Sequence, residues 1–219
     1  MSPPHPSTPI LCRSARPGLH SLLTALVLTL GLALGHHTLA LGAGTGQGAP
    51  SPAAFPDLPL NLSAQNAGAL GLGAAGPSSL SRIPAQALLV LLVSYFCPPC
   101  HKEIPRIKDL ERRIRERGLA GRIRMLGLAV GDDAALAERF KARHGGLPFA
   151  LVPDPALAAH KRLGSPVVPT LYCVASSGGK LRLVSTREGE FNEDPDAFLD
   201  ALLRALPAPP GSAKDSPRK

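Results

Sequence analysis

Cys97-Pro98-Pro99-Cys100-His101-Lys102-Glu103-Ile104-Pro105 is the stretch that decides the fold of this chain, together with the apolar run at 87–93 just before it. Seven consecutive apolar residues predict a strand that is buried on both faces. A buried strand that delivers a C-x-x-C to the start of a helix is the arrangement of a thiol–disulfide redox site. The helix N-terminus favours a thiolate there, because it carries partial positive charge and unpaired N–H groups. In such a site one cysteine attacks a partner disulfide and the other resolves the mixed disulfide.

Three other kinds of site share parts of this pattern. Cys97-x-x-Cys100-His101 also matches the C-x-x-C-H motif of covalent c-type haem attachment, although the buried strand before it and the proline after it disfavour haem. Ser94-x-x-Cys97 matches half of the peroxiredoxin pattern, but Val90 stands where that pattern expects proline. A zinc site is weaker still, because one C-x-x-C with one histidine supplies too few well-spaced ligands, and we expect no bound metal.

The first forty residues resemble a secretory signal. Arg13 and Arg16 precede a leucine-rich segment from His20 to Leu34, no acidic residue is present, and Thr38-Leu39-Ala40 is an acceptable cleavage site. The alternative is an uncleaved membrane anchor, which the histidines at 36 and 37 disfavour. We therefore expect export to the periplasm, with attachment to the inner membrane as the alternative.

Cysteine usage agrees with a redox role in an exported protein. Cys12 precedes the apolar segment, so three cysteines remain after cleavage, namely Cys97, Cys100 and Cys173. Disulfides persist outside the cytosol, and an odd count argues for one working pair and one bystander rather than a structural framework. We expect Cys173 to be a buried, inert thiol.

The net charge of +8 does not indicate a nucleic-acid-binding protein. Basic residues gather between 106 and 124, but acidic residues are interleaved with them and no aromatic residue is mixed in. This pattern predicts a solvated helix face instead.

The domain boundaries follow from composition. Residues 41–57 are rich in Gly, Ala, Pro and Ser and predict a flexible linker, and residues 207–219 predict a disordered tail. Residues 58–206 then form one domain, with a core at 87–206 and a short strand or hairpin within 58–86.

Within the core, strands and helices alternate before two final strands. Buried strands are predicted at 87–93, 123–130 and 149–152, and helices at about 99–117, from 132 or 133 to 144, and at 155–163. Strands at 170–175 and 180–186 are joined by a Ser-Ser-Gly-Gly turn, and a helix begins after Asp194. The first strands should be parallel and the last two antiparallel, which gives an α/β sandwich with a mixed sheet.

These features resemble the thioredoxin fold and, within it, the TlpA/ResA-like exported thiol–disulfide oxidoreductases. The matches are Cys97-x-x-Cys100-x-x-Glu103-x-Pro105, Val168-Pro169-Thr170 before a strand, and an extra helix and strand at about 132–152 that resemble a central α/β insert. The resemblance implies a three-layer sandwich over residues 80–206. Phe96 replaces the tryptophan that often precedes the first cysteine, and the chain has no tryptophan.

The resemblance also implies the roles of individual residues. Cys97 is the exposed nucleophile, Cys100 the buried resolving thiol, Glu103 a proton donor or acceptor, and Pro169 a cis-proline facing the sulfur atoms. The Val168 backbone would pair with an extended substrate peptide, and the substrate surface would comprise Phe96, Pro98, Pro99, Val168 and Thr170. An ordinary first-turn glutamate is the alternative for Glu103.

The active-site prolines bear on the direction of electron flow. Pro98 and Pro99 lack an N–H, so only the later amides of the turn can support the Cys97 thiolate. Weaker stabilisation of the reduced form favours a reductant. We therefore expect a monomeric disulfide reductase without a cofactor, which acts on other exported proteins and is recharged by a membrane or periplasmic thiol donor. A thiol peroxidase and a haem protein are the alternatives.

Overall fold

The computed structural model of the protein describes residues 53–207. Five strands form the central sheet, in the order β5-β4-β3-β6-β7. They are β3 (Ala87–Val93), β4 (Ile123–Val130), β5 (Ala150–Asp154), β6 (Thr170–Ser177) and β7 (Lys180–Glu188). The expected signal segment, most of the expected linker and the tail beyond residue 207 lie outside the described residues.

The strand directions follow the predicted mixed pattern. β3 pairs in parallel with β4, and β4 in parallel with β5. β6 runs antiparallel to β3, and β7 runs antiparallel to β6. The predicted α/β class with a thioredoxin-like mixed sheet is therefore confirmed.

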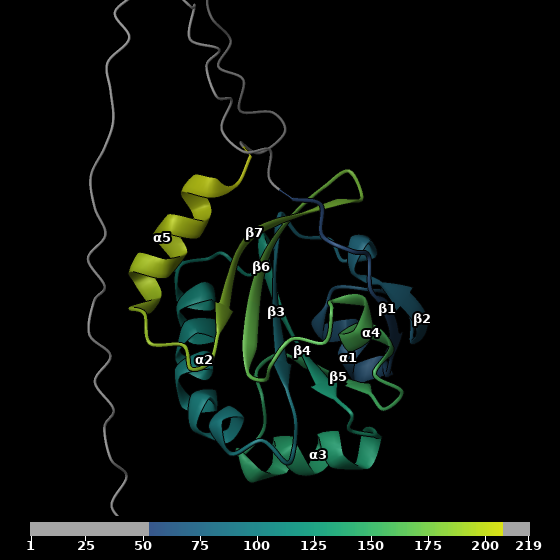
Figure 1. Ribbon diagram of the computed structural model, residues 1–219. Coiled ribbons are helices and arrows are strands. Elements are labelled where there is room, and N and C mark those ends of the chain that lie inside the picture. Colours follow the sequence, from purple (N-terminus) through teal and green to yellow (C-terminus); the bar gives the residue numbers. More distant parts are fainter. Residues whose placement is uncertain (1–52, 208–219) are drawn as a thin grey trace, which may run out of the picture. The chain divides into compact units, whose positions relative to one another are not determined.

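Both faces of the sheet are covered, which explains why β3 is apolar at every position (Figure 1). Helices α2 (Pro98–Glu116), α3 (Ala134–Arg143) and α5 (Pro195–Ala205) contribute side chains to one core, together with the odd-numbered residues of β3. The even-numbered residues of β3 pack on the other face, against the N-terminal segment. Side chains alternate between faces along a strand, so a strand between two layers needs apolar residues throughout.

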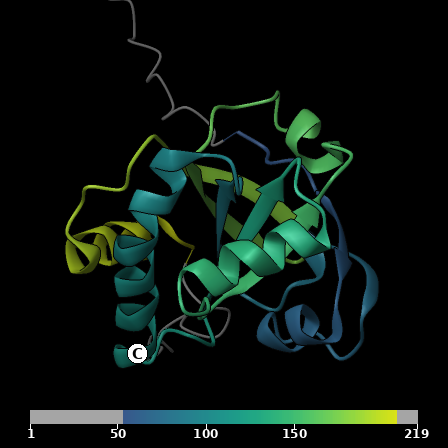
Figure 2. The same cartoon turned by 90° about the horizontal axis from the view of Figure 1, so that it is seen from below.

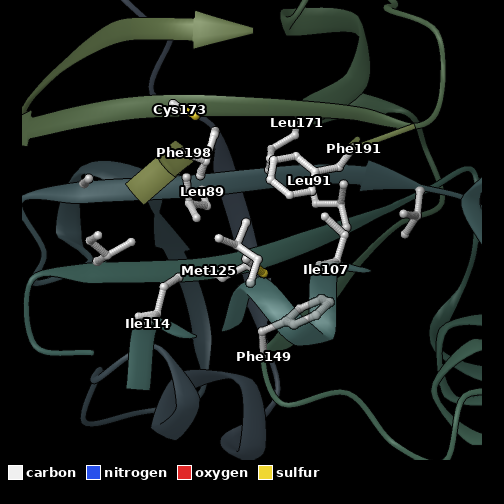
Figure 3. Close-up of a cluster of buried hydrophobic side chains, with 14 of the residues drawn as sticks. Leu89, Leu91, Ile107, Ile114, Met125, Phe149, Leu171, Cys173, Phe191 and Phe198 are labelled. Carbon is white, nitrogen blue, oxygen red and sulfur yellow. The ribbon is translucent and has the colours of Figure 1, made fainter. Parts of the chain in front are cut away.

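The first core joins elements that are far apart in the sequence (Figure 3). Leu89 and Leu91 of β3, Ile107 of α2, Phe198 of α5 and Phe191 before α5 are all buried there. Phe191 and Phe198 lie edge to face, with ring centroids 5.1 Å apart. This core holds α2, and with it the C-x-x-C motif, against the sheet.

The N-terminal part of the domain contains more structure than the predicted short strand or hairpin. It comprises β1 (Pro59–Leu62), α1 (Ala64–Ala69), β2 (Gly76–Ser79) and a 3₁₀ turn (Leu80–Arg82), with β1 antiparallel to β2. Ser63 caps α1 by accepting a hydrogen bond from the Asn66 N–H. This segment covers the second face of the sheet through a row of buried leucines at 58, 60, 62, 70 and 80.

The domain also begins earlier than predicted. Ala54 bridges to β7, and the Phe55 N–H donates to the Leu181 carbonyl at 3.0 Å. Phe55 is buried against Tyr172, with ring centroids 5.4 Å apart. The end of the expected linker therefore packs on the sheet, because its single aromatic side chain finds an apolar surface there.

The helix boundaries lie within a few residues of the predictions. Asp133, not Asp132, caps α3, and Asp194 caps α5. The predicted helix at 155–163 is shorter and forms α4 (Ala158–Arg162), because Asp154 first closes a turn and then accepts bonds from the Ala159 and His160 amides. Among residues 53–207, no helix has both the length and the apolar character needed to span a bilayer.

Candidate redox site

Cys97 and Cys100 form a disulfide at the N-terminus of α2, with their Cα atoms 5.3 Å apart. Cys97 is the N-cap residue, and its Sγ accepts a hydrogen bond from the Cys100 N–H at 3.2 Å. Pro98 and Pro99 occupy the first two helical positions and are exposed, whereas Cys97 is 9% and Cys100 0% exposed. Cys97 is thus less exposed than predicted for the nucleophile, although it is the more accessible residue of the pair.

The turn before β6 brings a second backbone segment to the disulfide. The Val168–Pro169 peptide bond is cis, as the resemblance implies. The carbonyl oxygen of Val168 lies 3.6 Å from the Cys97 Sγ. Pro169 is buried and Val168 is half-buried, and the carbonyl of Val168 is the group of this turn that contacts the sulfur.

Thr170 supports this turn and is not part of its surface. Its side chain is fully buried, and its hydroxyl donates to the Val167 carbonyl at 2.7 Å. On α4, His160 Nε2 donates to the Pro166 carbonyl at 2.8 Å. The expectation that the Thr170 side chain contacts substrate is therefore not met in this conformation, because the hydroxyl is used to fix its own turn.

Two large apolar side chains flank the disulfide and face solvent. Phe96 is 73% exposed and Val167 is 62% exposed, and they are the exposed large hydrophobic residues of the described chain. Phe96 precedes Cys97 in sequence, and Val167 belongs to the turn that faces its sulfur. Exposed apolar surface at such a place is typical of a binding site for another molecule.

Glu103 follows Cys100 by three residues on α2 and is almost completely buried, at 2% exposed. Its Oε1 accepts a hydrogen bond from the Phe191 N–H at 3.2 Å, whereas Oε2 has no partner among residues 53–207. Burial raises the pKa of this carboxyl to about 7, opposed by that hydrogen bond and assisted by Glu190. A carboxyl with such a pKa can exchange a proton with a neighbouring thiol near neutral pH, which an ordinary exposed first-turn glutamate would not do.

Pro105 lies inside α2, which begins seven residues earlier at Pro98. The helix therefore begins before this proline, as the predicted start at about residue 99 requires. Asp132 supports the loop that precedes the cysteines. Its side chain is 1% exposed and accepts hydrogen bonds from the Tyr95 N–H at 2.6 Å and from the Ser94 hydroxyl at 3.2 Å. Sequence reasoning assigned Asp132 only as a possible helix cap and missed this contact, because the loop lies 37 residues away.

Both ring nitrogens of His101 have hydrogen-bond partners, so neither is free to bind a haem iron. Its Nε2 bonds to the Tyr95 carbonyl at 2.7 Å, and its Nδ1 lies 2.8 Å from Nε2 of His144. A haem ligand needs a free ring nitrogen, so haem ligation would require one of these bonds to break. Within residues 53–207, no group of three or more His, Cys, Asp or Glu side chains could hold a metal ion.

Cys173 is the free thiol of the described chain and lies in β6 with no exposed surface. Burial raises the pKa of its thiol to about 11, partly offset by a hydrogen bond with Ser185. Such a thiol is almost entirely protonated at neutral pH and therefore a poor nucleophile.

Comparisons with known proteins support the thioredoxin-like fold. No protein-family model matches the chain, and no curated protein matches it by sequence. Among solved structures, a protein from Chlorobium tepidum whose assigned name is thiol:disulfide interchange protein DsbE is similar at a TM-score of 0.53 and 17% identity, covering 70% of this chain and 96% of that one. A thioredoxin-family thiol:disulfide interchange protein from Chlorobium tepidum TLS has a TM-score of 0.50 and 17% identity, covering 72% and 99%.

A third neighbour is the thioredoxin domain of a thiol-disulfide oxidoreductase from Bacteroides vulgatus. Its TM-score is 0.50 at 12% identity, and the match covers 71% of this chain and 99% of that domain. Thioredoxin-fold thiol:disulfide oxidoreductases are thus structural neighbours of this chain at low identity. Identities this low establish the fold, and the chemistry must be argued from the site itself.

Proposed function

We propose that this protein is an exported thiol–disulfide oxidoreductase that reduces disulfides of other exported proteins through Cys97 and Cys100. The observation that carries the proposal is the Cys97–Cys100 disulfide at the start of α2, opposite the Val168 carbonyl and beside exposed Phe96 and Val167. This places an accessible sulfur, a strand-like backbone edge and an apolar surface at one point.

The reaction would begin with the dithiol form of the protein. The Cys97 thiolate attacks one sulfur of the substrate disulfide, and the other substrate sulfur leaves as a thiolate that takes up a proton. The Cys100 thiol then loses its proton and attacks Sγ of Cys97, which releases the second substrate sulfur as a thiol. The substrate gains two electrons and two protons, and the protein is left as the disulfide.

Glu103 is suited to the second step. Because burial raises its pKa to about 7, it is partly ionised at neutral pH and can accept the proton of the buried Cys100 thiol. Val168 would present its carbonyl to an extended substrate segment, as in strand addition. Phe96 and Val167 would contact apolar side chains next to the substrate disulfide, with Pro98 and Pro99 at the rim.

The direction of electron flow and the location follow from sequence arguments. The prolines remove two N–H donors from the turn, and the Cys100 amide donates directly to the Cys97 sulfur. Fewer donors stabilise the thiolate less, which favours a reductant. The basic, leucine-rich N-terminal segment supports export to the periplasm, and recharging then requires a membrane or periplasmic dithiol donor.

A trapping experiment tests the function. The full chain with Cys100→Ser should accumulate mixed disulfides between Cys97 and exported proteins, which mass spectrometry identifies. The Cys97→Ser variant is the matched control and should trap none. Rapid hydrogen peroxide turnover that persists in Cys100→Ala would instead support a peroxidase, and a Soret band from the purified protein would support the haem alternative.

A further inference from the structure

Two histidines from different helices meet beside the redox turn. His101 follows Cys100 on α2, and His144 is the C-cap residue of α3, which lies in the segment that resembles a central insert. His101 Nδ1 and His144 Nε2 are 2.8 Å apart, and their rings stack with centroids 5.1 Å apart and planes 26° apart. The two helices lie next to each other in both views (Figures 1 and 2).

The partners of the pair define which nitrogen carries each proton. A carbonyl oxygen only accepts, so His101 Nε2 must carry the proton that it donates to Tyr95. In a neutral ring His101 Nδ1 is then unprotonated and accepts from the Nε2–H of His144. The hydrogen bonds thus run in one direction, from the C-terminus of α3 through His101 to the backbone of Tyr95.

The pair is also fixed from its sides. Phe140 of α3 stacks on His101, with centroids 4.8 Å apart, and is fully buried. Lys108 of α2 donates from Nζ to the His144 carbonyl at 2.7 Å. On the other side of the turn, Asp132 holds the Tyr95 N–H and the Ser94 hydroxyl. Tyr95, two residues before Cys97, is therefore held at its carbonyl by His101 and at its amide by Asp132.

We propose that His101 is a positioning residue for Cys97, and that His144 of the insert braces it so that the redox turn keeps its thiolate-stabilising geometry. This inference rests on the proposed function and concerns the positioning of the nucleophile in that same site. The Cys97 sulfur depends on the Cys100 amide at 3.2 Å, and two prolines have removed the other early donors. A turn with so few donors loses a large share of its thiolate stabilisation when that one distance lengthens.

The hydrogen bond between His144 and His101 can persist when the pair binds one proton. The first can bind Nδ1 of His144, which leaves the existing hydrogen bonds in place and makes the bond to His101 charge-assisted. A second would put N–H groups on both facing nitrogens and break the bond. The groups around the pair are Lys108 and Arg143, which are cationic, and Asp132 across the Tyr95 peptide. Desolvation, His101 and those cations lower the pKa of His144, which favours the neutral form of its ring.

The test compares four variants of the reduced full chain: His144→Ala, His144→Gln, His101→Ala and Asp133→Ala. The pH dependence of alkylation at Cys97 is followed by mass spectrometry of the Cys97 peptide. Both alanine variants of the pair should raise the pKa of Cys97 by about half a unit, which lowers its thiolate fraction about threefold at pH 7. The equilibrium with glutathione should shift toward the disulfide by a similar factor.

The other two variants separate positioning from general stability. In His144→Gln the glutamine amide can still donate to His101 Nδ1, so the thiolate fraction of Cys97 should stay within about twofold of the wild-type value. Asp133→Ala removes the N-cap of α3 without touching the pair, so it should weaken the helix but leave the pKa of Cys97 unchanged.

Opposite results would overturn the inference. If folded His101→Ala and His144→Ala both keep the wild-type pKa of Cys97, the pair only packs the insert against α2. If Asp133→Ala shifts that pKa as much as they do, the effect is one of stability. If the wild-type protein does not reduce disulfides but the variants still shift the pKa of Cys97, the proposed function is wrong and the positioning role of the histidine pair holds.

Discussion

The Cys97 sulfur lies 3.6 Å from the carbonyl oxygen of Val168, a residue 71 positions later in the chain. This contact joins the start of α2 to the turn before β6, whose exposed member is Val167. A molecule that reaches Cys97 therefore meets the backbone of Val168 and the apolar side chains beside it.

The exposed apolar pair beside the disulfide should affect protein substrates only. We expect Phe96→Ser with Val167→Ser to raise the KM for a disulfide-bonded protein such as insulin by about tenfold, because about 1.4 kcal/mol of apolar contact would be lost. The rate with oxidised glutathione, which is too small to cover both side chains, is the control and should stay within about twofold. Equal losses with both substrates would show that the pair acts on the thiol itself.

Stability should depend on pH through Glu103. Burial raises its pKa in the folded protein to about 7 from the ordinary 4.5, so the folded state binds this proton more tightly than the unfolded chain does. The stabilising contribution is complete below about pH 4.5, decreases as the pH rises through the window between these values, and is lost above pH 7. Through Glu103, the free energy of unfolding of the wild type should fall by up to about 3 kcal/mol between pH 4.5 and pH 8. This fall should be absent in Glu103→Gln, as measured by urea unfolding at the two pH values.

The same variant tests the role of Glu103 in exchange. The rate at which the wild-type dithiol reduces a disulfide should show an ionisation near pH 7 that is absent in Glu103→Gln. Glu138→Gln removes an exposed carboxylate and is the control for a change of net charge. An unchanged pH profile in Glu103→Gln would show that Glu103 has a structural role and does not transfer a proton during exchange.

Thiol reactivity should follow burial. In the reduced, folded protein we expect iodoacetamide to modify Cys97 first, and Cys173 only after unfolding, because Cys173 is fully buried and its pKa is raised to about 11. Peptide mass mapping at pH 7.5 distinguishes the sites, and the same reaction in denaturant gives the reference rate. Modification of native Cys173 at a rate comparable to Cys97 would contradict this order.

The loop before the cysteines should depend strongly on Asp132. Asp132→Ala leaves the Tyr95 N–H without its acceptor, and we expect it to lower the free energy of unfolding by about 2–3 kcal/mol. Ser94→Ala removes only the hydroxyl at 3.2 Å and should cost about 1 kcal/mol. Urea unfolding of the two variants measures the difference, and equal losses would mean that the amide is satisfied in another way.

Local sequence signals predicted the core elements because each arises from neighbouring residues. The apolar run at 87–93 indicates a strand covered on both faces, and the recurrence of Ile107, Leu110 and Ile114 indicates one buried helix face. The C-x-x-C followed by Glu103 and Pro105, with Val168-Pro169 before β6, then pointed to the thioredoxin-like fold. The structure confirms that fold.

The N-terminal segment was less predictable from sequence. Leu58, Leu60 and Leu62 alternate as in a strand, but β1 has only four residues and α1 only six, which is too short for a clear periodic signal. What places it is contact with the sheet: Asn66 Nδ2 donates to the Leu151 carbonyl of the edge strand β5 at 2.8 Å. Its partner lies 85 residues away, which no local pattern encodes.

By itself the sequence determined the strand–helix alternation, the position of the two cysteines at a helix start and the burial of Cys173, since periodicity, caps and apolar runs are local properties. Only the tertiary structure decided that Asp132 holds the Tyr95 amide, that Phe191 covers Glu103, that the Thr170 hydroxyl turns inward and that His101 meets His144. Except for the Thr170 hydroxyl, which bonds within its own turn, each of those relationships joins residues that are tens of positions apart. Hydrogen bonds are short and directional, so such pairs exist only once packing of the sheet and helices has fixed the distance between them.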